Sequence, residues 1–118
     1  MRRRGLVLTP GDVVELDLGM PAGSEAGLRR PAVVVTAARI LRGGPNVVQV
    51  VPLTRTIRTS STEVVIDPDE DNRLATRSSA QCQHVRSVAT TRIRQRTGNV
   101  GPVVLGEVRE TLAPLLNP

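Results

Sequence analysis

Short apolar runs with a period of two residues recur along the chain and predict a protein built mainly from β-strands. In the first run, residues 13–18, Val14 and Leu16 alternate with the charged Glu15 and Asp17, as in a strand with one buried face. Similar runs predict strands at residues 31–38, 46–54, 62–66, 79–88 and 96–100. The pattern favours a small, curled β-barrel of five to seven strands.

The two central strands carry further information about their neighbours and ends. A Gly-Gly-Pro-Asn turn signal separates strand 31–38 from strand 46–54, so we expect these two strands to be antiparallel neighbours. Pro52 has no backbone N–H to donate, so the second strand is predicted to form an edge, to bulge or to end close to it. Thr54 is then expected at a strand terminus that faces a cleft or solvent.

The other segments are predicted to be loops, a helical turn and one helix. Residues 19–27 hold three glycines and a proline, so we expect a mobile surface loop. Residues 67–73 are predicted to form a turn and residues 90–95 a helical turn. A helix of about three turns is predicted from Pro102, with Pro114 kinking its end. Its packing face consists of the apolar residues at 104, 105, 108, 112, 115 and 116.

Composition limits the fold and its setting. The chain has no aromatic residue, so its core must be filled by Val, Leu, Ile and Ala. The single Cys82 excludes an intramolecular disulfide and a cysteine cluster for zinc. No apolar stretch approaches the roughly 20 residues of a membrane span, and the apolar run after Arg2–Arg4 is too short for a secretion signal. We therefore expect a cytosolic protein with a flexible basic N-terminus, residues 1–10, and a single domain, residues 11–118.

Charge is segregated along the chain. The net charge is +5, and every basic residue is an arginine. Two arginine-rich stretches, residues 26–62 and 72–106, flank an acidic block within residues 63–71. The two stretches are candidates for one surface that attracts phosphates. The alternative is that the arginines are scattered over a solvated surface, and the acidic block, which lacks the spacing of a calcium loop, is predicted to be a solvated turn.

Several kinds of catalysis lack their required residues. The chain has no HExxH or GxSxG motif and no glycine loop with a lysine. His84 is the only histidine, which excludes a histidine pair within one subunit. Arginine with hydroxyl and carboxylate partners remains. A guanidinium stabilises the charge that builds on phosphorus when an RNA 2′-hydroxyl attacks, so such a site needs neither metal nor cofactor.

Five stretches occur in an order that is typical of one family. The segment "PGDVVELDLGMPAGSEAGLRRPAVVVTAA" combines a Gly-Asp strand start, a Gly-Ser-Glu loop, and an Arg-Pro pair that opens a valine-rich strand. It is followed by "VVQVVPLTRT", "STEVVI", "QHVRSV" and "GNVGPVVLGEVRETLAPLL". Together these stretches, from Gly11 to Leu116, resemble the MazF/PemK family of toxin endoribonucleases.

The resemblance implies a fold and an activity. The fold is an SH3-like barrel of the plasmid-maintenance toxins (CcdB/MazF-like), with a C-terminal α-helix, in a homodimer. The activity is metal-independent cleavage of single-stranded RNA at short motifs, which leaves a 2′,3′-cyclic phosphate and a 5′-hydroxyl. The partner is an acidic, MazE-like antitoxin that blocks the site.

The resemblance also assigns roles to residues. Arg30 and Thr54 match the family's catalytic arginine and threonine, and Glu25 matches the glutamate of its Gly-Ser-Glu loop. We expect Arg30 to stabilise the transition state electrostatically, Thr54 to orient or relay a proton, and Glu25 to align Arg30. The alternative is a structural Arg30–Glu25 pair that fixes the loop. RNA contacts are expected at Ser24, Arg29, Arg55, Thr56, His84 and Arg86.

The chain departs from the family pattern at two points. The first strand usually carries an aromatic residue, and without one no base can stack on a protein ring. His84 stands where the family has glutamine. This histidine is expected either to contact RNA and tune the pH dependence, or to be an ordinary packed or solvated residue.

Two other function classes fit the same fold. CcdB-type relatives poison DNA gyrase and cut no RNA. A non-catalytic module that binds RNA or sequesters an antitoxin is the other alternative. The set of Glu25, Arg30 and Thr54 favours the endoribonuclease.

Overall fold

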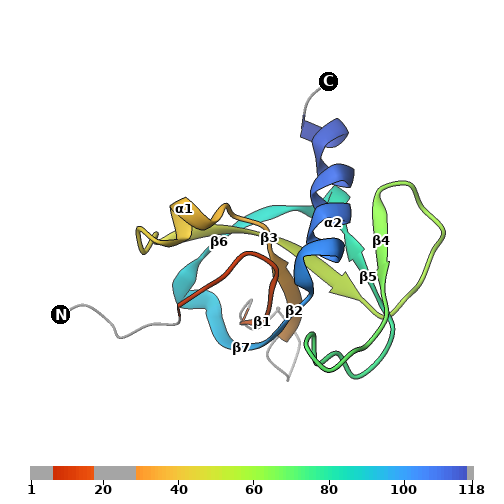
Figure 1. Ribbon diagram of the computed structural model, residues 1–118, viewed down its shortest axis with the longest axis horizontal. Coiled ribbons are helices and arrows are strands. Elements are labelled where there is room, and N and C mark those ends of the chain that lie inside the picture. Colours follow the sequence, from red (N-terminus) through yellow and green to blue (C-terminus); the bar gives the residue numbers. More distant parts are fainter. Residues whose placement is uncertain (1–6, 18–28, 117–118) are drawn as a thin grey trace, which may run out of the picture.

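The computed structural model describes residues 7–17 and 29–116 (Figure 1). The strands within this part of the chain are β1 (Asp12–Asp17), β2 (Arg29–Val34), β3 (Val47–Thr54), β4 (Glu63–Ile66), β5 (Ser78–Gln81), β6 (Arg86–Ala89) and β7 (Ile93–Asn99). The helical elements are α1 (Ala38–Leu41), the 3₁₀ turns η1 (Cys82–His84) and η2 (Thr90–Arg92), and α2 (Gly101–Leu116). The protein is mainly β with a C-terminal helix, as the sequence predicts.

All strand pairs in the described residues are antiparallel, and β3 links two parts of the sheet. The first half of β3, residues 47–50, pairs with β6, while Leu53 and Thr54 pair with β5. On its other edge β3 pairs with β2, and the order continues through β1 to β7. The predicted antiparallel pairing of the two central strands is therefore confirmed. Pro52 lies where the partner of β3 changes from β6 to β5, close to the end of the strand.

The two faces of the sheet have separate hydrophobic cores. The inner core is enclosed by the curled part of the sheet and contains Val14, Leu16, Ala32, Val34, Val48, Val50, Val88 and Ile93. The outer core lies under α2 and contains Val13, Val33, Val51, Leu53, Ile66, Cys82, Val108 and Leu112. Consecutive residues of β1, β2 and β3 enter opposite cores because side chains alternate along a strand. These strands are buried on both faces, which explains their runs of valine.

Helix α2 is longer than predicted. It spans 16 residues, about four and a half turns, and packs Leu105, Val108 and Leu112 on the outer core. Leu115 and Leu116 were predicted on the same face, but they are 41% and 67% exposed. Figure 1 shows the reason: the end of α2 projects beyond the sheet. None of the helices in the described segments is long and apolar enough to span a membrane.

The strand predicted at 31–38 ends early. After Val34 the Val35 amide still donates to Gln49 O of β3 at 3.0 Å, and at the next residue the Thr36 hydroxyl takes the place of a backbone partner. Thr36 Oγ1 accepts a hydrogen bond from the Gln49 amide at 2.8 Å and donates to Gln49 Oε1 at 2.9 Å. The chain then forms α1 inside the segment that was predicted to be strand and turn.

The prediction of one strand at 79–88 is wrong. The segment forms β5, η1 and β6, because Cys82 turns into the outer core and is fully buried. The Cys82 amide donates to Thr62 O at 3.0 Å, and the Val85 amide closes the turn on Cys82 O at 3.1 Å. Similarly, the helical turn expected at 90–95 is limited to η2, and the last strand begins at Ile93 rather than at residue 96.

Some predictions fall outside the described residues. These are the mobile loop at 19–27, most of the predicted N-terminal segment, and Leu18 at the end of the first strand. The described end of that N-terminal segment contacts the fold. Leu8 packs against the inner core, and the Thr9 amide donates to the Asp12 carboxylate at 2.7 Å.

Candidate functional site

A groove of about 680 Å³ opens where the inner core reaches the surface at the start of β2. Apolar side chains of β1 and β3 and Val85 form part of its lining, and polar side chains of β2, β5, η1 and β6 form the rest. The lining residues are Leu16, Arg30, Val50, Pro52, Gln81, Gln83, His84, Val85 and Arg86. Cationic side chains line this groove, and no carboxylate belongs to its described lining.

Arg30 is placed in the groove by the alternation along β2. Ala32 and Val34 lie on the same strand face and are fully buried in the inner core. Arg30, two residues earlier, continues that face past the end of the core and is exposed. Within the described part of the chain its guanidinium makes no hydrogen bond or ion pair. No described residue occupies its N–H groups, so they can bind a phosphate.

Thr54 lies at the end of β3, as predicted. Ala32–Pro52 is the last pair between β2 and β3, and Thr54, two residues after Pro52, pairs with Ser79 of β5. The Thr54 side chain is held in a turn, because its Oγ1 accepts a hydrogen bond from the Thr56 amide at 3.1 Å. The hydroxyl proton remains available for donation. Thr54 does not itself line the groove; it lies just beyond Pro52.

The turn η1 brings His84 and Arg86 to the groove together with Gln83. In one continuous strand, Gln83 would face away from His84 and Arg86. The 3₁₀ turn breaks this alternation, so neighbouring side chains reach the same groove. His84 and Arg86 are exposed, and their side chains have no hydrogen-bond partner among the described residues. Arg30 and Arg86 come from the two arginine-rich stretches, so those stretches converge here in part.

Gln81 and Gln83 line the groove but are absent from the residues predicted from the sequence. Both residues belong to the segment 79–88 that the sequence predicts to be one strand. The burial of Cys82 directs the two glutamines toward the groove. The signal available in the sequence was a single cysteine between two glutamines. The groove lining therefore contains two uncharged amide side chains beside its cationic ones.

Glu63, the first residue of β4, does not line this groove but binds Gln83, which does. Its side chain is only 1% exposed. Its Oε1 accepts the Ser79 hydroxyl at 2.9 Å, while Oε2 accepts both Gln83 Nε2 and Arg58 Nη2 at 2.7 Å. The bond from Gln83, followed by those from Arg58 and Ser79, holds the pKa of Glu63 below its usual value although burial opposes this. Glu63 is thus ionised at neutral pH and acts only as an acceptor.

The other residues predicted for the site lie outside the groove. Arg29 faces away from Arg30 and forms an ion pair with Glu15 at 3.4 Å. Arg55 and Thr56 are exposed in the segment that follows β3. Ser24 and Glu25 lie outside the described residues.

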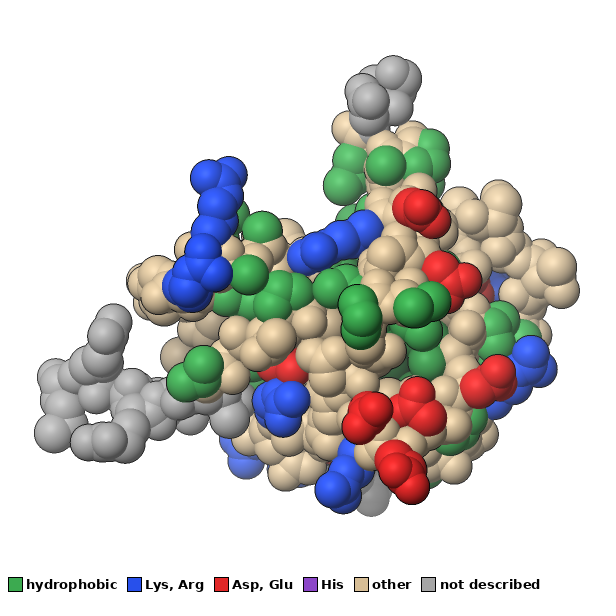
Figure 2. Space-filling view, viewed as in Figure 1, with side chains coloured by type: hydrophobic (Ala, Val, Ile, Leu, Met, Phe, Trp, Pro, Cys, Tyr) green, Lys and Arg blue, Asp and Glu red, His purple; other side chains and the backbone are tan. Residues whose placement is uncertain are grey.

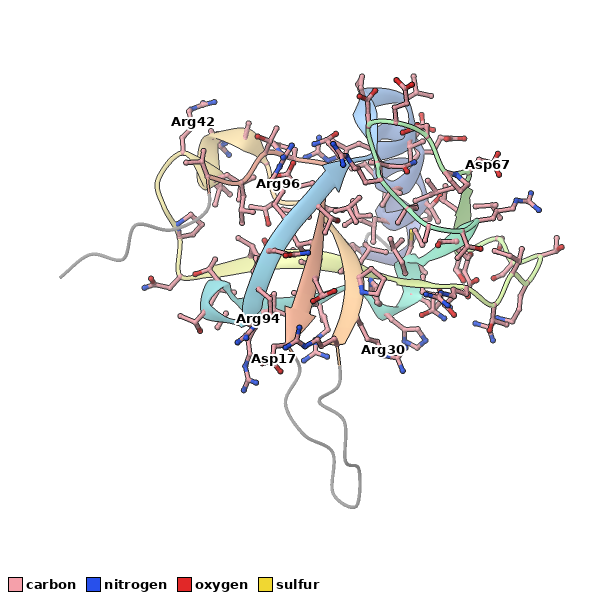
Figure 3. The ribbon with its side chains drawn as sticks, turned by 90° about the horizontal axis from the view of Figure 1, so that it is seen from below. Asp17, Arg30, Arg42, Asp67, Arg94 and Arg96 are labelled. Carbon is pink, nitrogen blue, oxygen red and sulfur yellow. The ribbon has the colours of Figure 1, made fainter. Side chains whose placement is uncertain are left out.

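Most other arginines with a recorded partner hold the fold together. Figure 3 shows Arg94 beside Asp17 at the ends of β7 and β1, close to Arg30 at the start of β2. The Arg94–Asp17 distance is 3.5 Å, and farther along β7, Arg96 Nε lies 2.8 Å from the fully buried Asp12 carboxylate. These guanidinium groups are occupied by carboxylates.

A second groove, of about 480 Å³, lies between β4 and α2. Its described lining includes the carboxylates Glu63, Glu107 and Glu110, and Figure 2 shows acidic side chains gathered beside α2. This charge repels phosphate.

The acids at 67–71 lie in an exposed turn, as predicted, while Glu63 of the same block belongs to β4. Asn72 is 1% exposed and bonds to Asp69 and to Asp67 O, so its amide organises the loop. Gly98 of β7 passes so close that an added Cβ would lie 2.5 Å from Asp71 O, and only glycine fits there. The described residues contain no group of three acidic, histidine or cysteine side chains arranged for a metal. Burial raises the pKa of Cys82 to about 11, so this thiol stays protonated.

Comparisons with known proteins agree on one family. Residues 9–116 match the family model described as PemK-like, MazF-like toxin of type II toxin–antitoxin system. Endoribonuclease MazF9 of Mycobacterium tuberculosis is 35% identical over 109 residues, which cover 86% of this chain and 90% of that protein. A MazE–MazF structure from Deinococcus radiodurans has a TM-score of 0.77 at 30% identity, covering 94% of this chain and 96% of that one. An endoribonuclease from a mycobacterial species has a TM-score of 0.75, covering 97% and 95% of the two chains, but at 22% identity it supports the fold alone.

Proposed function

We propose that this chain, which belongs to the family of PemK-like, MazF-like toxins of type II toxin–antitoxin systems, cuts single-stranded RNA at the groove beside Arg30 and Thr54. The chain is a toxin endoribonuclease, because the family match covers residues 9–116 and its 35% identical relative is an endoribonuclease. The toxin domain extends over residues 11–118.

The observation that supports the site is the free guanidinium of Arg30 in a groove whose described lining has no acid. Phosphate cleavage needs a cation that is not already neutralised. Arg86 adds a second free guanidinium on the opposite wall, and His84 lies beside it. Of the two grooves described above, this one offers an electrostatic site for an RNA backbone.

The proposed reaction does not require a metal ion. The 2′-hydroxyl of the RNA attacks the adjacent phosphorus and loses its proton, and the 5′-oxygen leaves and gains one. The products are a 2′,3′-cyclic phosphate and a 5′-hydroxyl. Arg30 stabilises the negative charge on the phosphorane oxygens, and Thr54 orients the reacting groups or relays a proton. Glu25, five residues before Arg30 in the sequence, aligns Arg30.

The RNA backbone runs from the groove along the neighbouring polar residues. His84 and Arg86 contact it in the groove, and Arg55 and Thr56 extend the path beyond Thr54. Ser24 and Arg29 complete the set at the start of β2. Because the chain has no aromatic residue, base recognition rests on hydrogen bonds and arginine stacking.

The partner is a cognate, acidic, MazE-like antitoxin. The relatives from Deinococcus radiodurans are MazE–MazF structures, and acidic side chains complement the cationic groove described above. The toxin acts as a homodimer in the cytosol, where its RNA substrate is found.

The test is digestion of a long RNA in EDTA with wild type, Arg30→Ala and Thr54→Ala, followed by analysis of the new ends. Wild type is expected to yield cyclic phosphate and 5′-hydroxyl ends. Arg30→Ala should cut on the order of 10²–10³-fold more slowly, since one lost charge-stabilising donor has that effect, and Thr54→Ala should be strongly impaired.

The matched control is Arg77→Ala, which removes an equal charge from an exposed pair with Asp67 at 3.1 Å, away from the groove. It should cut like wild type. Undiminished cutting by both site variants would refute the proposed site. Cutting that stops in EDTA would refute the metal-independent reaction.

A further inference from the structure

The side-chain amide of Gln83 has a hydrogen-bond partner at its NH₂ group and no described partner at its carbonyl oxygen. Its Nε2 donates to Glu63 Oε2 at 2.7 Å, and no described residue binds its Oε1. The side chain is exposed and lines the groove together with Arg30, His84 and Arg86. The free end of the amide is therefore available to a ligand in the groove.

The charge state of Glu63 decides which end is free. An ionised carboxylate accepts hydrogen bonds and donates none, so the NH₂ group of Gln83 must face it. The three donors around Glu63, which come from β5, η1 and the segment after β3, keep it ionised and in place. If Gln83 flipped, its carbonyl oxygen would face the carboxylate, and two acceptors would repel each other.

We propose that Gln83 is a specificity-determining residue, a fixed acceptor that reads an N–H donor on an RNA base, and that Glu63 is the positioning residue that orients it. This proposal rests on the proposed endoribonuclease function. The backbone phosphates of RNA carry only acceptors, so a carbonyl oxygen gains nothing from them. The bases of single-stranded RNA expose N–H donors on their Watson–Crick edges. Arg30 and Arg86 then bind phosphate, while Gln83 selects the base beside it.

The test compares cleavage motifs. A long RNA of mixed sequence is digested to low extent by full-length wild type and by Gln83→Leu, and the cut sites are mapped by sequencing the new ends. Gln83→Leu should lower the preference for the favoured base about tenfold at one position of the motif, the effect of one lost base contact. The preferences at the other positions should stay as in wild type.

The role of Glu63 is tested by Glu63→Gln and Glu63→Asp. The first replaces the acceptor-only carboxylate by an amide that can also donate, so that either end of Gln83 can face it. The second keeps the charge but shortens the reach toward Gln83. Both should relax the preference at the same position as Gln83→Leu, by a smaller factor. Melting temperatures identify any variant that does not fold, and one folded Glu63 variant is sufficient.

The matched control is Arg58→Met, which removes the other strong donor to Glu63 Oε2 and leaves the Glu63–Gln83 bond intact. Its motif should equal that of wild type. An unchanged motif in Gln83→Leu, a relaxation spread over all positions, or an Arg58→Met profile equal to those of the Glu63 variants would each overturn the proposal. Because wild type is digested alongside, a failure of the endoribonuclease function itself appears separately, as a wild type that does not cut.

Discussion

Arginines lie in two neighbouring regions of the sheet. In one region carboxylates neutralise them, and in the other no described carboxylate does. On the β1–β7 side, Arg94 and Arg96 meet the carboxylates of Asp17 and Asp12. In the groove at the start of β2, Arg30 and Arg86 meet no described carboxylate. Figure 3 shows that these regions are close, since Arg30 lies near the Arg94–Asp17 pair.

The difference shows that arginine itself does not mark the site. β1 carries Asp12 and Asp17 within reach of Arg96 and Arg94 of the neighbouring β7, so these two guanidinium groups are neutralised and connect the two strands. On β2, Ala32 and Val34 fill the positions after Arg30, and the facing strand offers Pro52 and Val50. The groove keeps its positive charge because its neighbours are apolar or amide side chains.

Replacing each arginine by lysine should separate the two regions most strongly. Arg30→Lys keeps the charge but loses the planar fork that fits phosphate, so cleavage should slow on the order of a hundredfold. Arg94→Lys changes an exposed ion pair of small energetic value and should leave the cleavage rate unaltered. Single-turnover cleavage rates of the two variants measure the contrast, and equal rates would remove the distinction.

Removing Arg96 should produce the opposite phenotype. Arg96→Met leaves the fully buried Asp12 carboxylate with only the hydrogen bonds from Thr9 and Asn99. We expect a loss of about 1–3 kcal/mol in the free energy of unfolding, measured with urea, and a normal cleavage rate per folded molecule. Arg94→Met is the control and should lose at most about 0.5 kcal/mol. Stability equal to wild type in Arg96→Met would show that this pair contributes nothing.

The smallest expected effect is a change in the salt dependence of RNA binding. Arg86→Gln should reduce the slope of log affinity against log salt by about 0.7, the value for one phosphate contact on a single strand. Binding is measured with an RNA that carries a 2′-deoxy nucleotide at the cut site, so that no cleavage occurs. Arg77→Gln removes a paired, distant charge and should keep the wild-type slope. Identical slopes in both variants would place Arg86 away from the backbone.

Apolar runs located the strands well where both faces of a strand are buried. Strand β3 was predicted within one residue, and the closing helix was predicted from its apolar spacing. Prediction failed where one side chain redirects the backbone. Thr36 ends the pairing of β2, and Cys82 divides the segment 79–88, because each satisfies a tertiary contact that local periodicity does not contain.

For the site, the sequence by itself determined the available chemistry. The chain has one histidine and no lysine, so arginine remained as the side chain for phosphate chemistry. The ordered motifs then indicated Arg30 and Thr54 as the candidates. It also supplied two arginine-rich stretches without indicating which members of each would meet.

The tertiary structure alone decided which groups are free and how they are turned. Arg29 and Arg30 are adjacent in sequence, yet strand alternation pairs one with Glu15 and leaves the other open. The orientation of Gln83 follows from a glutamate 20 residues away. Whether a charge or an amide is available to a ligand depends on its neighbours in space, and those neighbours are set by register, turns and burial.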